Sequence, residues 1–203
     1  MNEYQSKIKG VLISEEQIKA QIKEGAAYID SLYDGRPILL VSILKGSFVF
    51  LADICRATSV PCQISFMCAK SYYNGTESCG KVTITMDLDV DITQYHVVIV
   101  EDIIDTGRTL SEIVKILQVR NPLSLHVVTL LDKPARRQVD FSADYSLFTI
   151  EDRFVIGYGL DCAEYYRTLP YIAEYAESIY FIYAAWRNPC RVFFHILSDV
   201  DIV

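Results

Sequence analysis

The chain has 203 residues, of which 51% are apolar, and a formal net charge of −7. This length is enough for one sizeable core and short for two, so we expect a single domain over residues 1–203. The negative charge argues against bulk nucleic-acid binding, and any anionic ligand must be held by local donors rather than by a general basic field.

The ends and cysteines of the chain argue against secretion and against a membrane. The N-terminal residues lack an apolar signal region, and no apolar run is long enough to span a bilayer. The six cysteines form no Cys-x-x-Cys pair, and most lie in apolar stretches where a thiol packs as a small hydrophobe. We therefore expect a soluble protein in a reducing cytoplasm.

The first predicted helix begins after Ser14. Ser14 and Gln17 have the spacing of a capping box, which satisfies backbone N–H groups at a helix start. The helix should end near Asp34-Gly35. Its apolar positions recur at helical spacing: Ile18, Ile22, Ala26 and Ile29.

Three nearly continuous apolar runs predict buried strands, at residues 37–44, 96–100 and 125–131. A helix is expected at about 47–57, after the first strand. A second helical pattern lies between the other two strands, at Ile113, Val114, Leu117 and Gln118. Alternation of strands and helices predicts an α/β fold with a mostly parallel sheet.

Residues 82–92 alternate between apolar and polar side chains, which predicts a strand with one solvated face. The polar residues include Asp87, Asp89 and Asp91, and this spacing also occurs in calcium-binding loops. Such a loop requires glycine where Ile92 stands and glutamate where Val98 stands, so we favour the solvated strand. The preceding polar stretch, residues 71–78, is expected to form a mobile loop that acts as a lid.

The most informative segment is VVIVEDIIDTGRTL, residues 97–110, where a buried strand leads into acids and then a helix. Ligands of open α/β sheets bind outside the carboxyl ends of the strands. The backbone N–H groups and hydroxyls of residues 105–109, with the helix dipole, suit a phosphate. Glu101, Asp102 and Asp105 suit sugar hydroxyls, a magnesium ion or a proton. The pattern predicts a ribose 5-phosphate site; the alternative is an ordinary helix cap with solvated acids.

Common nucleotide-binding motifs are missing. No P-loop is present, and Gly157-Tyr158-Gly159 lacks the third glycine of a dinucleotide fingerprint because Cys162 stands in its place. A generic nucleotide-binding module and a dinucleotide fold are therefore disfavoured.

The same segment resembles the phosphoribosyl pyrophosphate motif of the type I phosphoribosyltransferases, in the form found in the hypoxanthine-guanine branch. Three further stretches resemble that branch in order: SILKGSFVFLADI, LLDKPARR and DRFVIGYGLDCAEYYR. The resemblance covers about residues 8–171. It implies a mostly parallel sheet flanked by helices, with a small hood and a flexible loop. It also implies transfer of phosphoribose from phosphoribosyl pyrophosphate to hypoxanthine or guanine, with release of pyrophosphate.

The resemblance assigns one group of residues to phosphoribosyl pyrophosphate. Magnesium and the ribose hydroxyls would be held by Glu101 and Asp102, with Asp161 near a second magnesium. The pyrophosphate would meet Lys45, Gly46 and Arg167. The peptide at Leu44-Lys45 is often cis in the family. The cradle for the 5′-phosphate would be Asp105, Thr106, Gly107, Arg108 and Thr109.

A second group is assigned to the purine and to catalysis. Asp105 would accept the proton of purine N7. Lys133 would donate to the 6-oxo group, which favours hypoxanthine and guanine over adenine. The flexible loop corresponds to Ser71 and Tyr72. The remaining purine contacts would be made by Phe154, Val155 and Asp161, Phe154 by stacking.

The resemblance does not extend over residues 174–203. We expect an extra packed element or a subunit contact there, burying Trp186, Phe193 and Phe194. The competing function is a regulator that keeps the fold and the phosphoribosyl pyrophosphate site without catalysis; it would need a basic face or an added domain. Dimers and tetramers both occur in the family, so a homodimer or homotetramer is expected.

Overall fold

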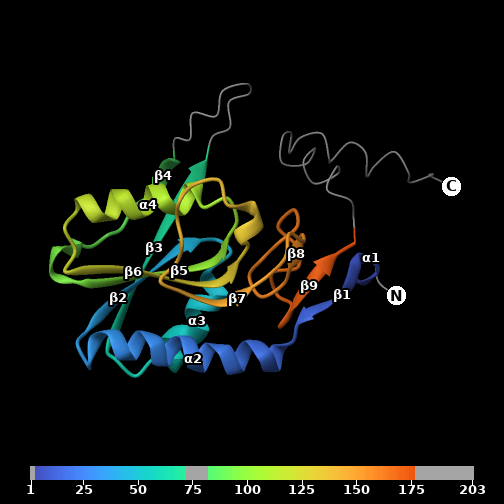
Figure 1. Cartoon of the computed structure of the whole chain (residues 1–203), viewed down its shortest axis with the longest axis horizontal. Helices are drawn as coiled ribbons and strands as arrows, with labels where there is room; N and C mark the ends of the chain where they lie inside the picture. Colours follow the sequence, from blue (N-terminus) through green and yellow to red (C-terminus); the bar gives the residue numbers. More distant parts are fainter. Residues whose placement is uncertain (1–2, 72–81, 177–203) are drawn as a thin grey trace.

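A computed structural model describes residues 3–71 and 82–176 of the chain (Figure 1). Four α-helices, two short 3-10 helices and nine strands follow one another in this part. The helices are α1 (Glu3–Ser6), α2 (Glu15–Tyr33), α3 (Phe48–Ala57), α4 (Arg108–Val119), η1 (Ile92–Gln94) and η2 (Pro134–Arg136). The strands are β1 (Ile8–Ile13), β2 (Ile38–Leu44), β3 (Cys62–Ser71), β4 (Val82–Met86), β5 (His96–Ile104), β6 (Ser124–Asp132), β7 (Tyr145–Thr149), β8 (Val155–Ile156) and β9 (Ile172–Tyr175).

The larger sheet has six strands in the order β4-β3-β2-β5-β6-β7. All neighbouring pairs are parallel except β3 with β4, which confirms the predicted mostly parallel α/β sheet. From β2 the chain passes through α3 to β3 on one side, and from β5 it passes through α4 to β6 on the other. The order therefore reverses between β2 and β5, and ligands of open α/β sheets bind at such a switch point.

Helices cover both faces of this sheet. In Figure 1, α2 and α3 lie on one face and α4 lies on the other. Successive residues of β2 are buried on opposite faces: Ile38 and Leu40 pack in the cluster with α2 and α3, and Leu39 and Val41 in the cluster with α4. A strand buried on both sides has no need of polar residues, which explains the nearly continuous apolar runs.

The first long helix follows its sequence signals. Ser14 and Gln17 form the capping box, and the helix ends at Asp34 in the left-handed conformation, with φ 47°. Ile18 and Ile29, two of the predicted apolar positions, are buried. The predicted helix boundaries are therefore confirmed.

A second, smaller sheet stands at one end of the large one (Figure 1). It has three antiparallel strands in the order β1-β9-β8. The pairing joins residues near the start of the described chain to residues near its end, for example Ile8 with Tyr175. This sheet carries the segment 157–167 beside the end of β2, as the contacts of Gly159 with Gly46 require.

The predicted strand over residues 82–92 is wrong beyond Met86. The three aspartates that follow bind side chains or backbone instead of lining a strand. Asp87 forms an ion pair with Arg120 and accepts the N–H of Leu88. Asp89 accepts the hydroxyl of Ser65, and Asp91 caps η1. Local hydrogen bonding by aspartate competes with strand pairing, which ends β4 early.

One predicted strand is longer in the structure than the sequence indicated, and some predictions concern residues that the structure does not describe. The strand expected at 96–100 continues to Ile104, because β6 keeps pairing with it as far as Asp132. Ser71 ends β3, whereas Tyr72 and the segment 174–203 beyond Ala176, with Trp186, Phe193 and Phe194, lie outside the described residues. None of the described helices combines the length and apolar character of a membrane span.

Substituting Val98, which is 0% exposed in β5, by alanine tests the two-faced core. Loss of two buried methyl groups and the resulting cavity should lower the free energy of unfolding by about 2 to 3 kcal/mol. Val119→Ala, at a position 80% exposed at the end of α4, is the matched control and should change stability by less than about 0.5 kcal/mol. Urea denaturation of both variants measures the difference. Equal destabilisation would contradict the assigned burial.

Candidate functional site

The carboxyl end of β5 carries two acids with few compensating partners. Oε2 of Glu101 is buried and has no hydrogen-bond partner. Burial, and secondarily the neighbouring Asp102, raises the pKa of Glu101 well above its usual value. Burial also raises the pKa of Asp102 to about 6, although the Arg167 guanidinium acts in the opposite direction. Carboxylates partly removed from water in this way are costly on their own and suit a cation or a hydroxyl donor from a ligand.

Gly46 allows Asp102 to approach the turn after β2. A Cβ built on Gly46 would lie 1.6 Å from Oδ2 of Asp102, so no other residue fits without displacing the carboxylate. Ser47 fixes the turn by a hydrogen bond to Ser42: the two hydroxyl oxygens lie 2.6 Å apart, and both residues are fully buried. The Leu44-Lys45 peptide is cis. The ends of β2 and β5 are thus in direct contact.

The turn of residues 105–109 leads from β5 into α4. Gly107 begins the helix with φ 79°, and a Cβ there would lie 3.0 Å from Cδ of Arg137. The backbone N–H of Arg108 lies 3.4 Å from Oγ1 of Thr106, and Nε of Arg108 is buried without a hydrogen-bond partner. A helix start with N–H groups and an unsatisfied guanidinium nitrogen suits a phosphate.

Two arginines that the sequence analysis did not assign hold Asp105. Nε of Arg136 donates to Oδ1 of Asp105 at 2.9 Å, and the same guanidinium lies 3.6 Å from Asp152. Arg137 donates to the backbone carbonyl of Asp105 at 2.7 Å and forms an ion pair with Asp132. The Asp105 side chain remains 43% exposed. Both arginines lie in the LLDKPARR stretch, whose basic residues were the available signal.

Lys133 follows β6 and is buried, with 7% of its surface exposed. Its Nζ donates to the backbone carbonyl of Arg153. Burial lowers the pKa of Lys133, while Asp105 and Asp152 act in the opposite direction. Most lysines lie at the surface, and a buried lysine needs a hydrogen-bond partner. Lys133 is buried and has one, which distinguishes it from an ordinary surface lysine.

The segment around β8 places the other residues predicted to contact a purine. The Phe154 ring meets Tyr175 edge to face, with ring centroids 5.8 Å apart. Val155 is 5% exposed and packs in the hydrophobic core, so its side chain offers no surface to a ligand. Oδ2 of Asp161 accepts the backbone N–H of Glu164 at 2.8 Å.

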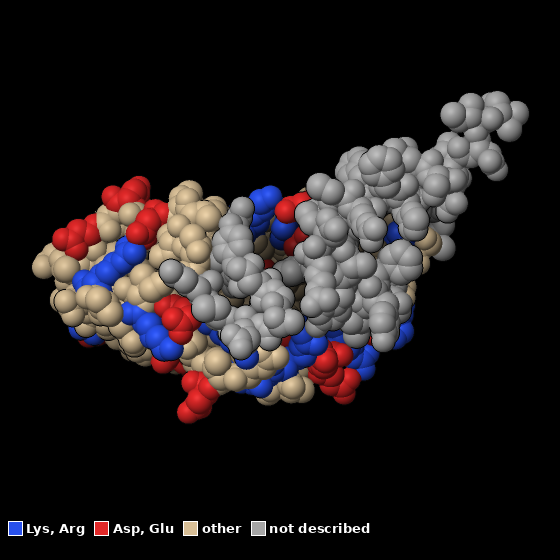
Figure 2. All heavy atoms as spheres, turned by 90° about the horizontal axis from the view of Figure 1, so that it is seen from above, with Lys and Arg blue, Asp and Glu red and all other residues tan. Residues whose placement is uncertain are grey.

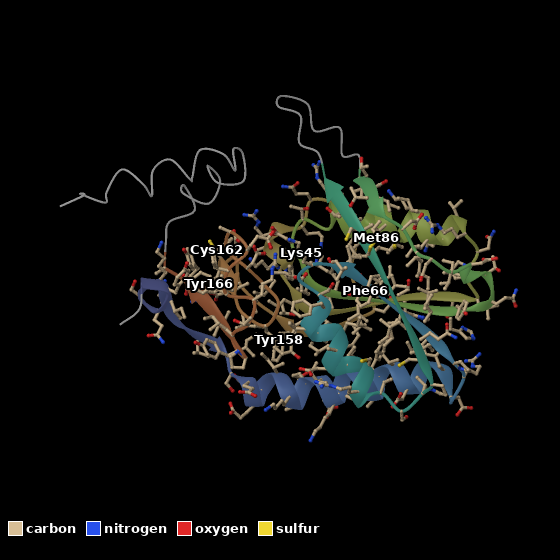
Figure 3. All side chains as sticks on the ribbon, turned by 180° about the vertical axis from the view of Figure 1, so that it is seen from behind. Lys45, Phe66, Met86, Tyr158, Cys162 and Tyr166 are labelled. Carbon is tan, nitrogen blue, oxygen red and sulfur yellow. The ribbon has the colours of Figure 1, made fainter. Side chains whose placement is uncertain are left out.

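Arg167 and Lys45 converge on one acidic side chain. Arg167 donates to the carbonyl of Gly159 at 2.8 Å and lies 3.0 Å from Asp161. Oε2 of Glu164 lies 3.1 Å from Nη2 of Arg167 and 3.2 Å from Nζ of Lys45. Figure 3 shows Lys45 directed toward the loop that carries Cys162. Sequence reasoning missed Glu164, since an exposed glutamate gives no signal of its own.

The acids predicted to hold magnesium do not form a cage by themselves. Within residues 3–71 and 82–176, no group of three or more His, Cys, Asp or Glu side chains is placed to hold a metal ion. Glu101, Asp102 and Asp161 therefore offer only part of a coordination shell. Magnesium usually takes one or two carboxylates and completes its shell with water and ligand phosphates.

Charges of both signs share the face seen in Figure 2. On the part of this face that is described, basic and acidic side chains are interspersed, and no large field of one sign appears. This face therefore offers an anion individual donors and no general basic field, in keeping with the negative net charge.

The chain is similar in sequence to known phosphoribosyltransferases. A family model described as "Phosphoribosyl transferase domain" matches residues 13–163. The hypoxanthine phosphoribosyltransferase of Salmonella typhimurium is 48% identical over 166 residues, covering 81% of this chain and 93% of the relative. The hypoxanthine-guanine phosphoribosyltransferase of Staphylococcus epidermidis is 47% identical over 173 residues, covering 85% and 97%.

Solved structures show the same similarity. A crystal structure of a hypoxanthine-guanine phosphoribosyltransferase from Bacillus anthracis has a TM-score of 0.79 and 48% identity, and covers 82% of this chain and 98% of its own. A hypoxanthine phosphoribosyltransferase from Staphylococcus aureus has a TM-score of 0.82 and 45% identity, and covers 86% and 95%. With the family model matching most of its length, the chain belongs to the phosphoribosyltransferase family.

Proposed function

We propose that the protein is a purine-salvage enzyme that transfers the 5-phosphoribosyl group of phosphoribosyl pyrophosphate to N9 of hypoxanthine or guanine. The products are the nucleoside monophosphate and pyrophosphate. Relatives that are 46–48% identical carry the names hypoxanthine or hypoxanthine-guanine phosphoribosyltransferase. The observation that carries the proposal is the placement of Asp105 and the buried Lys133 beyond the adjacent strands β5 and β6. The relatives and solved structures named above give no support to the regulator alternative.

Lys133 selects the purine by its 6-substituent. An ammonium donates only, so it binds the 6-oxo group of hypoxanthine or guanine and cannot pair with the 6-amino group of adenine. One of its three hydrogens is taken by the carbonyl of Arg153, which orients the rest. Phe154 stacks on the base, and the backbone of Val155, with Asp161 nearby, meets the 2-position.

Asp105 acts as the general base that accepts the proton from N7 of the purine. N9 attacks C1′ of the ribose, the bond from C1′ to the pyrophosphate oxygen breaks, and the proton on N7 passes to the Asp105 carboxylate. The carboxylate also stabilises the positive charge that develops on the base and ribose. Arg136 donates to one oxygen of the Asp105 carboxylate. The Asp105 side chain is 43% exposed and so stays accessible to the base.

The other assigned residues hold phosphoribosyl pyrophosphate. Asp105, Thr106, Gly107, Arg108 and Thr109 cradle the 5′-phosphate, and the buried Nε of Arg108 is one available donor. Lys45, Gly46 and Arg167 hold the pyrophosphate, a role suited to an arginine whose buried Nε has no hydrogen-bond partner. Ser71, the last residue of β3, and Tyr72 would help to exclude water, which would otherwise capture the ribose cation.

The donor set suits magnesium. Glu101 and Asp102 would hold one ion and Asp161 would lie near a second, each completed by substrate oxygens, and the orphaned Oε2 of Glu101 suits a cation. When bound, magnesium neutralises charge on the departing pyrophosphate.

We also propose that residues 1–203 act as one domain in a cytoplasmic homodimer or homotetramer. The partly exposed apolar side chains of Phe66 and Met86, 38% and 41% exposed on neighbouring strands, support a subunit contact (Figure 3).

Asp105→Asn tests the proton acceptor. Loss of the basic carboxylate should lower kcat by about 10²- to 10⁴-fold while phosphoribosyl pyrophosphate still binds. Steady-state formation of nucleoside monophosphate with magnesium measures it, with hypoxanthine, guanine, xanthine and adenine tested separately. Asp34→Asn, at the exposed end of α2, is the control and should keep wild-type turnover. Wild-type protein that binds phosphoribosyl pyrophosphate but turns over no base would overturn the enzyme proposal.

Lys133→Gln tests purine selection. Replacing a charged donor at the 6-oxo group should raise KM for hypoxanthine and guanine by about 10- to 100-fold, because hydrogen bonds to charged groups contribute about 1.5 to 3 kcal/mol. KM for phosphoribosyl pyrophosphate should stay near the wild-type value. Lys115→Gln, in an exposed pair with Glu112, is the control. An unchanged KM for hypoxanthine would remove Lys133 from the purine site.

Asp102→Asn tests how much the ionised Asp102 carboxylate lowers the stability of the fold. Asp102 titrates at about 6 when folded and near its ordinary value of about 3.9 when unfolded, so stability falls as the pH rises through this window. Without metal or substrate, the variant should therefore be more stable than wild type above pH 6, by up to about 3 kcal/mol, with little difference near pH 4.

Asp87→Asn is the matched control with the opposite sign. The Arg120 guanidinium lowers the pKa of Asp87, so its charge stabilises the fold above its unfolded pKa. This variant should lose stability at neutral pH, and the loss should disappear in acid. Urea midpoints from pH 4 to 8 measure both variants. Parallel changes in the two would show that Asp102 carries no burial cost.

A further inference from the structure

The Glu164 carboxylate forms ion pairs with both of the cations assigned to pyrophosphate, Arg167 and Lys45. Its Oε2 lies 3.1 Å from Nη2 of Arg167 and 3.2 Å from Nζ of Lys45. These two cations come from segments far apart in the chain, the turn after β2 and the segment after β8. The Arg167 and Lys45 hydrogen bonds lower the pKa of Glu164, so the carboxylate is ionised at neutral pH.

The backbone of the loop is built to present this carboxylate. Three residues without the freedom of glycine adopt the left-handed region: Ala163 with φ 51°, Glu164 with φ 70° and Tyr166 with φ 73°. The carboxylate of Asp161 accepts the N–H of Glu164 at 2.8 Å and thereby fixes its position. Left-handed conformations of such residues are uncommon and gather at functional sites, where the strain serves the mechanism.

Arg167 and Glu164 differ in how firmly they are held. The Arg167 side chain is 17% exposed and is also bound to Gly159 and Asp161, so it stays in place without Glu164. The Glu164 and Lys45 side chains are 63% and 67% exposed, and exposed ion pairs are weak. A ligand of higher negative charge can therefore replace the Glu164 carboxylate without disturbing the guanidinium.

We propose that Glu164 is an internal stand-in for pyrophosphate: its carboxylate holds Arg167 and Lys45 in the free protein, and the pyrophosphate group displaces it on binding. This inference rests on the proposed function, which places pyrophosphate at these cations. Competition by Glu164 weakens binding of both phosphoribosyl pyrophosphate and the released pyrophosphate, and so favours product release. Glu164 is a positioning residue and touches no reacting atom.

The experiment compares wild type with Glu164→Gln, using magnesium pyrophosphate as the probe in calorimetric titrations. Removal of the competing charge should lower the dissociation constant by about three- to tenfold, the range expected when one or two partly exposed ion pairs are lost. KM for phosphoribosyl pyrophosphate should fall in parallel, and KM for hypoxanthine should stay unchanged. Glu164→Asp keeps the charge and should return part of the way to the wild-type dissociation constant.

Glu15→Gln is the matched control, because Glu15 also pairs with a lysine through an exposed contact, on α2. It should leave the dissociation constant unchanged. Weaker or unaltered pyrophosphate binding in Glu164→Gln would overturn the inference, as would an equal gain in Glu15→Gln, which would indicate a general charge effect. Wild-type turnover is measured separately, so an inactive protein that still binds pyrophosphate would count against the proposed function and not against Glu164.

Discussion

The approach of Asp102 to Gly46 is the contact on which the candidate site depends. A side chain on Gly46 would overlap the carboxylate, and a Cβ on Gly159 would lie 2.0 Å from the Gly46 carbonyl. Three segments therefore meet at one glycine: the end of β5, the turn after β2 and the loop that carries Arg167. The reversal of strand order between β2 and β5 makes this meeting possible, since their connections leave toward opposite sides of the sheet.

The charges of the site are arranged unequally around this contact. Inside, Glu101 and Asp102 are half-buried with raised pKa values, and the protein supplies little to neutralise them. Toward the surface, Arg167, Lys45 and Arg136 are already paired with carboxylates. A ligand that brings a cation to the inner acids and an anion to the outer cations therefore matches both. Magnesium with a pyrophosphate ester has this distribution of charge.

Much of the fold could be predicted from local patterns. The capping box at Ser14, the doubly buried run of β2 and the helix of Leu117 follow rules that involve only neighbouring residues. The prediction was wrong at residues 87–91, where Asp87 pairs with Arg120 across the fold. Regular alternation of side chains reports neither such a distant partner nor the local hydrogen bonds of Asp87 and Asp91, which compete with strand pairing and end β4 early.

The sequence by itself determined the family and the sheet type, because the motif of residues 97–110 and the strand and helix patterns around it each lie within contiguous stretches of the chain. Only the tertiary structure decided which cations meet which acids. Arg136 reaches Asp105 across 31 residues, and Glu164, in the segment between β8 and β9, joins Arg167 to Lys45 after β2. The strength of an ion pair depends on the distance between the charges and on their burial. The number of residues between them in the chain determines neither quantity.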